Sequence, residues 1–398
     1  MTLEAETRTM GVRWDRLTVT MVLSFFVLVA GLSVGLVLAE LRAELGLTGL
    51  VAAAHGSTFG AGLLVMGAVG VHLVGRVGRT VAFWSTCGVI VVGVTVLCLG
   101  RHWWVTLSGT AIAGVACALL VLLAPGIVAD HHGDGWVHTF AAVNGVPGFA
   151  GIAFSLVVGA AIAAGVSWRA PYLGLTLLFA LALVLAGRRV RFPRGTPTGA
   201  SAIALVRRSG TRRPFVDVVH AVLSEFPLGV WAVVVLKEVG GASGGAAAAL
   251  GAMWGLSIMA SRLALPRIAE VAGRWTGTLG YAAVTIGSAL VWLGPGLGVR
   301  VLGIAIAGLG TGPLYPLAVE RLYARVDADT VSLGALTALA SGVAIATGPL
   351  LLGVLADVVG LRHAVLVVTA LGIAGVLRSR PIAEPPEPRV GGEARSTG

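Results

Sequence analysis

Long apolar runs recur along this chain of 398 residues, and they limit its fold more than any other feature. A bilayer crossing needs about 20 apolar residues, and a helix satisfies its own backbone hydrogen bonds there. Mean hydropathy is +0.93, and only 12% of the residues are charged. The sequence therefore predicts an all-α polytopic membrane protein with twelve transmembrane helices, at about 17–39, 50–72, 80–100, 103–129, 140–164, 170–187, 215–236, 244–265, 275–296, 299–322, 332–356 and 363–379.

The basic residues predict how the chain is oriented. If both termini are cytoplasmic, 22 of the 28 basic residues lie inside, and six lie outside: Arg42, Arg101, Arg169, Lys237, Arg300 and Arg362. Cytoplasmic loops of membrane proteins carry such an excess. We therefore expect a multi-pass protein of the bacterial inner (cell) membrane with both termini cytoplasmic. Topology accounts for the net charge of +10, so no nucleic-acid partner is expected.

A polar segment at 188–214 divides the chain. It predicts an N-terminal six-helix half (1–187), a basic cytoplasmic central loop (188–214), a C-terminal six-helix half (215–380) and a disordered cytoplasmic tail (381–398). A weak repeat supports two similar halves, because the loop Gly75–Arg79 is followed 195 positions later by Glu270–Arg274. Internal repeats are typical of transporters, whose binding site lies where the repeats meet. The many glycines are interpreted as close helix contacts, and the run from Gly308 to Pro316 as a bend.

These features together resemble the major facilitator superfamily over nearly the whole chain. Its loop motif is matched by Arg76, Gly78 and Arg79 in one half and by Glu270, Gly273 and Arg274 in the other, and the resemblance implies a cytoplasmic gate there. The usual acidic position of the first motif is Gly75. Other short motifs resemble actinobacterial exporter-type members, which transport drugs or metabolites: His55, Ser57, Phe59 and Gly62 in the second span, and Glu225, Phe226 and Trp231 in the seventh. The resemblance implies secondary transport by alternating access.

Glu225 is the only acidic residue in the middle of a predicted span. An ionised carboxylate there costs at least about 3 kcal/mol, so such residues usually face a water-filled cavity or a partner. Pro227 and Gly229 nearby favour a local helix break that lines a cavity. Glu225 is the leading candidate for proton coupling or substrate binding, although a structural carboxyl bonded to a neighbouring helix remains an alternative.

Three further titratable residues are candidates for the same task. Asp217 and His220 share a helix face and could relay a proton toward Glu225, although Asp217 could equally be a solvated residue at the end of its span. His55, in the second span, could titrate, bind substrate or join two helices. Arg262, near the inner end of the eighth span, is predicted to extend toward the cytoplasmic interface.

Polar and aromatic residues within the spans complete the candidate site. Four of them could line a cavity or simply pack between helices: Asn144, Trp231, Trp254 and Tyr315. The segment Asp130–His138 is rich in Asp and His but has no standard metal spacing, so no metal is predicted. No catalytic residues or cofactors are expected, and the absence of a P-loop argues against an ATP-driven pump.

The sequence leaves three functions open. The first is proton-coupled export (antiport) of a small amphipathic drug or metabolite by a monomer whose partners are the lipid bilayer, its small-molecule substrate and protons. The second is proton-linked or facilitated uptake of a small polar metabolite. The third is a transporter-like membrane sensor or scaffold. An enzyme is not expected, because no nucleophile–base pair recurs within the spans.

Overall fold

The computed structural model describes residues 12–133, 136–190, 192–193, 202–208, 210–328 and 330–379, without the side chains of 137, 138, 330 and 331. In this part of the chain every regular element is a helix. The predicted tail 381–398, both termini and most of the central loop lie outside it. The first helix group comprises α2 (Arg16–Leu32), α3 (Val34–Leu45), α4 (Gly49–Val77), α5 (Arg79–Leu99), α6 (Trp103–His132), α7 (Trp136–Ala163) and α8 (Arg169–Gly187).

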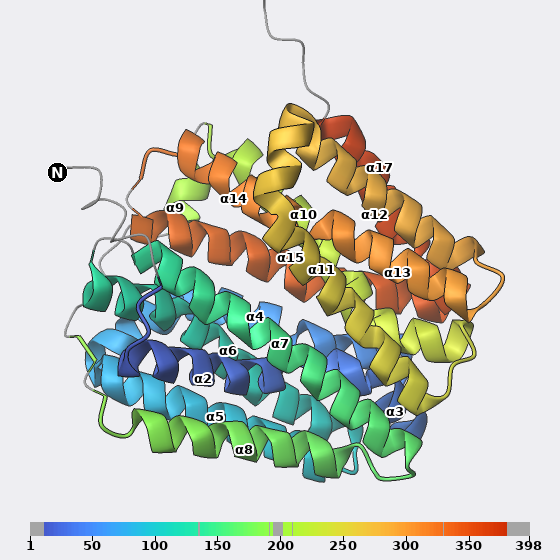
Figure 1. Cartoon of the computed structure of the whole chain (residues 1–398), viewed down its shortest axis with the longest axis horizontal. Coiled ribbons are helices and arrows are strands. Elements are labelled where there is room, and N and C mark those ends of the chain that lie inside the picture. The colour runs from blue at the N-terminus through green and yellow to red at the C-terminus, as the bar shows by residue number, and fades with distance from the viewer. Residues whose placement is uncertain are drawn as a thin grey trace, which may run out of the picture.

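The second helix group follows the short helix α9 (Ala202–Val206) of the central loop. Figure 1 shows the first group in blue to green on one side of the molecule and the second group in yellow to red on the other. The second group comprises α10 (Arg212–Val234), the π-helical turn η2 (Val235–Val239), α11 (Gly244–Ala272), the 3₁₀ turn η3 (Gly273–Trp275), α12 (Thr276–Leu293), α13 (Leu297–Thr311), α14 (Leu314–Arg325), α15 (Thr330–Val359), α16 (Leu361–Ala364) and α17 (Leu366–Ser379).

Eleven helical stretches in the described residues are long and apolar enough to cross a membrane. This result confirms the predicted all-α, multi-pass character. The longest stretch, Gly244–Leu293, has 50 residues and contains both α11 and α12. At 1.5 Å per residue it would extend about 75 Å, well beyond the roughly 45 Å of a bilayer. The chain bends between the two helices at Gly273, whose φ of 52° falls in the left-handed region that favours glycine.

Two of the predicted spans are built from broken helices. The first span divides into α2 and α3 at Ser33, and the tenth divides into α13 and α14 at Gly312 and Pro313. The second break confirms the bend predicted for the run from Gly308 to Pro316. Proline removes a backbone donor and clashes with the preceding turn, which accounts for the interruption there.

Glycines let neighbouring helices approach closely, as the sequence indicates. A Cβ atom on Gly93 of α5 would lie 2.7 Å from the carbonyl oxygen of Gly109 on α6. A Cβ on Gly60 of α4 would lie 2.1 Å from the backbone nitrogen of Ala346 on α15. Real side chains never come so near a backbone atom, so glycine at these positions is required for the observed packing.

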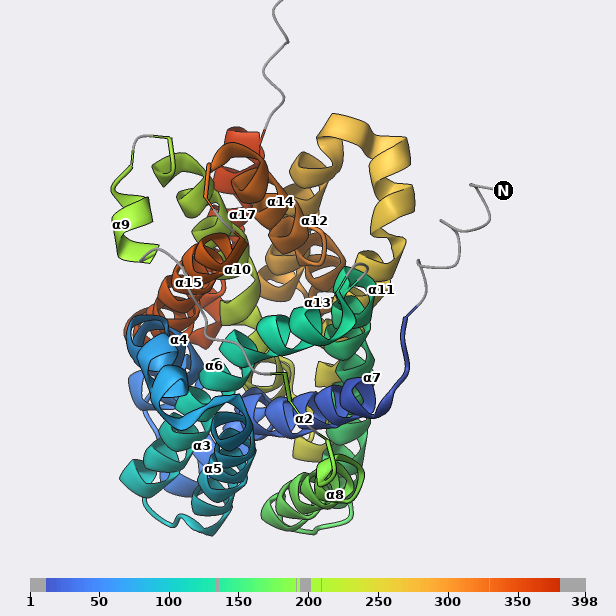
Figure 2. The ribbon, with the colours of Figure 1, turned by 90° about the vertical axis from the view of Figure 1, so that its left-hand side faces the viewer.

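The bundle has two ends, and Figure 2 looks onto the end at which α9 lies. We call them the α9 end, where α2 and α10 begin, and the η2 end, where α3 ends and α10 continues into η2. Where the two helix groups meet, α4 packs along α15, α7 along α11, and α3 against α10. Any site shared by both groups is therefore bordered by these six helices.

Candidate functional site

An ion pair joins α10 and α11 about halfway along their length. Arg262 Nη2 lies 3.2 Å from Oε2 and 3.4 Å from Oε1 of Glu225. Arg262 Nε also donates a hydrogen bond to the carbonyl oxygen of Gly312, at 3.2 Å, where α13 and α14 separate. The broken helix exposes a carbonyl that an intact helix would use internally. Glu225 therefore has the partner that its position in the span requires.

This contact corrects the predicted orientation of Arg262. Its guanidinium points to Glu225 and Gly312 instead of extending to the interface. The physical reason is that a carboxylate in a membrane span is costly unless an opposite charge compensates it. The Glu225 side chain is 15% exposed and the Arg262 side chain 42% exposed, so the pair is open on the arginine side. A solute reaching the pair would meet the guanidinium first.

The other candidates on α10 have partners on a different helix. Asp217 accepts a hydrogen bond from Nη2 of Arg378 on α17, at 2.7 Å. Nε2 of His220 lies 2.8 Å from the carbonyl oxygen of Leu371 on the same helix, and a carbonyl can only accept, so this nitrogen carries the proton. These contacts tie α10 to α17, whereas Glu225 contacts α11. A proton route from Asp217 to Glu225 stays a prediction.

His55 is completely buried between α4 and α6. Its Nδ1 lies 2.8 Å from the carbonyl oxygen of Val51, and its Nε2 lies 3.0 Å from Oγ1 of Thr106. Nδ1 must donate to the carbonyl. The one hydroxyl proton of Thr106 is shared between Nε2 and the carbonyl oxygen of Trp103, which lies 2.9 Å from Oγ1. Both ring nitrogens are thus engaged within the first helix group, and the predicted role of His55 in proton coupling or substrate binding stays a prediction.

The predicted cavity-lining residues differ in exposure. Asn144 is exposed and donates to the carbonyl of Phe140 in its own helix, at 3.0 Å. Trp231 is fully buried, and its indole N–H donates to the Pro349 carbonyl on α15, at 3.3 Å. Trp254 is nearly buried, with its indole nitrogen 2.7 Å from where a Cβ on Gly229 would lie. The structure thus places two of the four, both tryptophans, in helix packing.

Tyr315 is the predicted aromatic residue that the structure brings to the ion pair. It is partly buried at the start of α14 and lies close enough to interact electrostatically with both Arg262 and Glu225. The Tyr315 hydroxyl is also near the hydroxyl of Ser341 on α15, whose oxygen is buried. An acid on α10, a base on α11 and hydroxyl groups on α14 and α15 therefore form one polar group of residues.

The two loop motifs have different surroundings. Gly78, with φ 81°, lies between α4 and α5, and Arg79 pairs with Asp130 at the end of α6. Asp130 thus gives Arg79 an acidic partner from another helix. Arg76 is exposed, as are Glu270, Gly273 and Arg274 of the second motif, which form no ion pair in the part of the chain that the structure describes.

The η2 end holds a group of charged contacts that the sequence analysis missed. Lys237 of η2 pairs with Glu40 of α3, and Arg42 of α3 pairs with Glu238 of η2. Both pairs join the two helix groups. The sequence shows charged residues at the end of the first span and at the end of the seventh span. It does not show that these two span ends meet, so it could not predict the ion pairs between them.

Asp357 forms a third contact between the groups at this end. Its two carboxylate oxygens accept hydrogen bonds from the backbone nitrogens of Gly49 and Leu50, at 2.5 and 2.8 Å. These nitrogens begin α4, and the first N–H groups of a helix have no partner within it. A carboxylate at this position is also favoured by the helix dipole. Asp357 of α15 therefore caps a helix of the opposite group.

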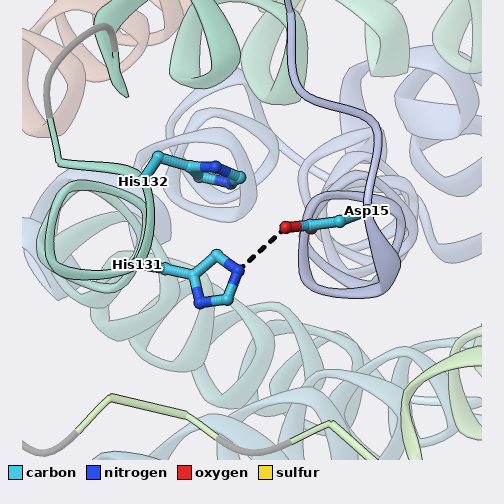
Figure 3. Close-up of side chains that lie close together, drawn as sticks. All are labelled: Asp15, His131 and His132. Carbon is cyan, nitrogen blue, oxygen red and sulfur yellow. Dashed lines mark hydrogen bonds and ion pairs between the residues drawn. The ribbon is translucent and has the colours of Figure 1, made fainter.

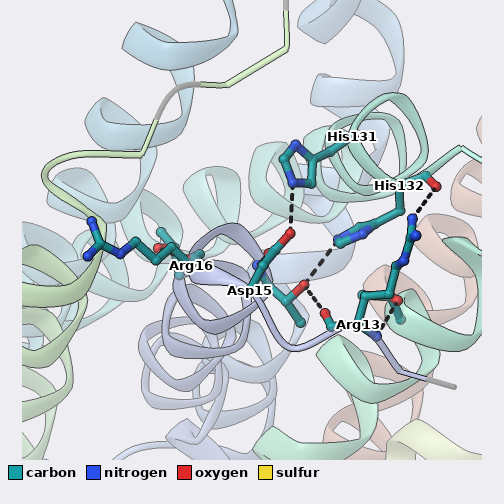
Figure 4. Close-up of polar contacts among 8 residues, drawn as sticks. Arg13, Asp15, Arg16, His131 and His132 are labelled. Carbon is teal, nitrogen blue, oxygen red and sulfur yellow. Dashed lines mark hydrogen bonds and ion pairs between the residues drawn. The ribbon is translucent and has the colours of Figure 1, made fainter.

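The Asp- and His-rich segment at the α9 end is divided among several partners. Figure 3 shows His131 pointing to Asp15, with Nε2 2.8 Å from Oδ2, and His132 next to His131 on the same side of that carboxylate. Figure 4 adds Arg13, whose guanidinium reaches the His132 carbonyl at 3.4 Å. His132 itself contacts Oγ1 of Thr18, at 3.0 Å.

Ligand atoms of Asp15, His131 and His132 lie within 4.8 Å of one another, which is close enough for a metal. However, each of these atoms already has a protein partner, and the nearby Arg13 cation disfavours a second positive charge. Asp134 lies outside the described residues, as does the side chain of His138. The expectation that no metal binds here stays a prediction.

The similarity of this chain to known proteins lies in its fold and not in its sequence. No family model matches the sequence, and no curated protein matches it. Among solved structures, a mutant of the nucleoside transporter NupG is 12% identical, with a TM-score of 0.75 over 92% of this chain and 98% of that one. A bacterial homolog of the human lysosomal transporter Spinster, in an inward-facing and occupied conformation, is 13% identical, with a TM-score of 0.71 over 92% and 95%.

The human organic anion transporter MFSD10 is 17% identical, with a TM-score of 0.64 over 92% of this chain and all of that one. The chain has the fold of these transporters. At such low identities the likeness establishes the architecture and not the substrate. All of these neighbours are transporters, and none is an enzyme.

Proposed function

We propose that this protein is a secondary active transporter of a bacterial cell membrane that works by alternating access. Its fold is that of known transporters, and its helices are long and apolar enough to cross a bilayer. In this proposal Gly244–Leu293 crosses twice, as α11 and α12, which gives twelve spans in two six-helix halves at 1–187 and 215–380. In this proposal the protein acts as a monomer, and the interface between its halves uses three helices from each half.

The α9 end faces the cytoplasm in this proposal. The segments at this end hold 22 of the 28 basic residues, and cytoplasmic segments of membrane proteins carry such an excess. A cysteine placed at Thr198, in the central loop outside the described residues, should react with membrane-impermeant reagents only from inside. Labelling from outside would refute the orientation.

The observed state then corresponds to an inward-facing conformation. The two helix groups make their ionic and capping contacts at the η2 end, through Glu40, Lys237 and Asp357. Close contact of α4 with α15 extends from Gly49 to about the middle of α4, whereas nothing approaches within 4 Å of a Cβ on Gly67. Outward opening would require these η2-end contacts to break and the α9 ends to close, with Arg79 and the second loop motif at the gate.

The Glu225–Arg262 pair is the observation that carries a coupling mechanism. A proton arriving at Glu225 neutralises its carboxylate, and Arg262 then loses its ionic partner. Arg262 becomes free to contact a solute or the opposite half, so protonation and rearrangement are linked. We propose that the chain exports a small amphipathic compound in exchange for protons, in line with its resemblance to exporter-type members. His55, Asp217 and His220 lie farther from this step.

The decisive test compares Glu225→Gln with wild type in proteoliposomes under an imposed pH gradient. The amide keeps the size but cannot exchange a proton, so pH-driven net transport should fall at least about tenfold, while exchange of substrate for substrate persists. Glu320→Gln is the matched control, because Glu320 is an exposed carboxylate on α14. Full pH-driven transport by the Glu225→Gln protein would remove proton coupling at this residue.

A second candidate is uptake of a small polar metabolite. It is favoured by one neighbour, which is a nucleoside transporter, and by the open guanidinium of Arg262, which can bind a polar or anionic solute. The direction in which substrate moves when a proton gradient is imposed separates uptake from export. Substrate that moves with the protons indicates uptake, and substrate that moves against them indicates export. A protein with the stability of a folded transporter, but with no substrate-dependent flux in either direction, would be a membrane sensor or scaffold.

A further inference from the structure

A hollow at the α9 end is lined by charged residues from the first turns of α10 and the last turn of α17. Its lining consists of Arg212, Arg213, Val216, Asp217 and Arg378. Three of these five residues are arginines, and two helices that are far apart in the sequence supply them. The hollow lies at the end of the second helix group and is separate from the Glu225–Arg262 pair.

The charges in this hollow are unbalanced. Arg378 Nη2 donates to Asp217 Oδ1 at 2.7 Å, so one positive and one negative charge cancel. Arg212 and Arg213 are both exposed, and neither makes an ion pair or side-chain hydrogen bond within the described residues. Among the described residues, two guanidinium groups that line the hollow therefore have no anionic partner.

The depth of the hollow matches the headgroup region of a membrane. Arg212 is the first residue of the candidate span that ends at Val239, and Arg378 is the penultimate residue of the last span. Polar headgroups form a layer outside the hydrocarbon core, where spans begin and end. Ligands at this level include the phosphate groups of lipids on the side of the membrane that we assign to the cytoplasm.

The hollow also has an apolar side. Val216 in its lining is 44% exposed, and Leu377, which precedes Arg378 in the chain but lies outside the lining, is 58% exposed. Exposed aliphatic side chains beside arginines fit a molecule that has both a charged group and hydrocarbon. A free inorganic anion would gain nothing from them. These residues favour an amphiphile over a small soluble ion.

We propose that this hollow binds the phosphate headgroup of an anionic phospholipid. Arginine forms paired, charge-assisted hydrogen bonds to phosphate oxygens, and basic pockets between transmembrane helices on the cytoplasmic side bind such headgroups. Arg212 and Arg213 contact the phosphate, while Arg378 is held in place by Asp217. The bound lipid thereby fixes the start of α10, the helix that carries Glu225. The inference rests on a membrane location and not on which solute is transported.

The test measures the melting temperature of purified protein in detergent with increasing phosphatidylglycerol, compared with phosphatidylcholine. Phosphatidylglycerol should stabilise the wild-type protein at lower concentration. The double variant R212Q/R213Q should need at least about tenfold more of it, because each lost guanidinium removes charge-assisted hydrogen bonds. R212K/R213K should restore part of the effect, since Lys keeps the charge but not the paired geometry.

The control variant is R207Q/R208Q. Arg207 and Arg208 are also consecutive, exposed arginines, located in the central loop, and lie outside the lining of the hollow. Their loss makes the same change in net charge and should leave the response to phosphatidylglycerol unchanged. An equal loss in both double variants, or no preference of the wild type for the anionic lipid, would overturn the proposal. Equal stabilisation by inorganic phosphate would assign the hollow to a soluble anion instead.

Discussion

Removing either member of the Glu225–Arg262 pair should have unequal effects on stability. Glu225→Gln leaves Arg262 with its hydrogen bond to Gly312 and with 42% of its side chain exposed, so the free energy of unfolding should fall by no more than about 1 kcal/mol. Arg262→Gln leaves a carboxylate that is only 15% exposed without its partner. Breaking a fully buried pair in this way costs about 3–5 kcal/mol, and the exposure of the arginine side reduces our expectation to about 1–3 kcal/mol.

The double variant decides whether the pair itself is responsible. Glu225→Gln should recover most of the stability that Arg262→Gln loses, because it removes the uncompensated charge. The coupling energy between the two positions should be about 1–2 kcal/mol. Thermal unfolding of all four proteins in the same detergent measures this cycle. Equal losses from the two single changes, or strictly additive effects in the double variant, would refute the assignment of Arg262 as the partner of Glu225.

Three other expectations can be tested on the same protein. Gly60→Val should lower the melting temperature markedly, because a Cβ there would lie 2.1 Å from the Ala346 backbone. Gly67→Val is the control and should not lower it, because no atom lies within 4 Å of a Cβ at that position. Equal losses from the two variants would contradict the close packing of α4 on α15. If His55 titrates during transport, His55→Gln should flatten the pH dependence of transport between about pH 5 and 8, and an unchanged profile would leave it a packing residue. Burial raises the pKa of the Asp15 carboxyl, but hydrogen bonds from neighbouring groups outweigh it and hold this pKa below its ordinary value. Its stabilising effect is therefore present above about pH 4 and is lost as the pH falls through the folded-state pKa, so Asp15→Asn should weaken the acid dependence of the melting temperature, and an identical dependence would refute it.

Glu225 illustrates what the chain alone can reveal about a site. A single carboxylate in an apolar run is improbable unless something compensates it, so the sequence identified the residue without any knowledge of its surroundings. Arg262 could not be identified in the same way. Its position near a span end suits both an interfacial side chain and a buried partner, and only the packing of α10 against α11 and α14 decides between them.

The charged residues at the ends of the spans show a similar limit. The number of basic residues on each side of the membrane was sufficient to predict the orientation of the chain, but it did not predict which acidic residue pairs with which basic residue. Asp130 appeared to belong to a metal-like run and instead pairs with Arg79. Glu40 and Lys237 are almost two hundred positions apart in the chain and meet across the two helix groups. Such pairs depend on which helix ends become neighbours, and hydropathy contains no information on that.

The sequence by itself determined that the protein is an all-helical membrane protein, because a bilayer leaves apolar runs of this length no other way to satisfy their backbone. It also determined where close helix contacts and the bend before Pro313 are possible, since glycine and proline act locally. Only the tertiary structure decided how the helices pair, which gives Glu225 its arginine, Asp357 the free nitrogens of α4, and Arg212 its place in a basic hollow. The physical reason is that a helix needs only its own residues to form in a membrane, whereas each of these contacts needs side chains from two helices that the chain brings together in space.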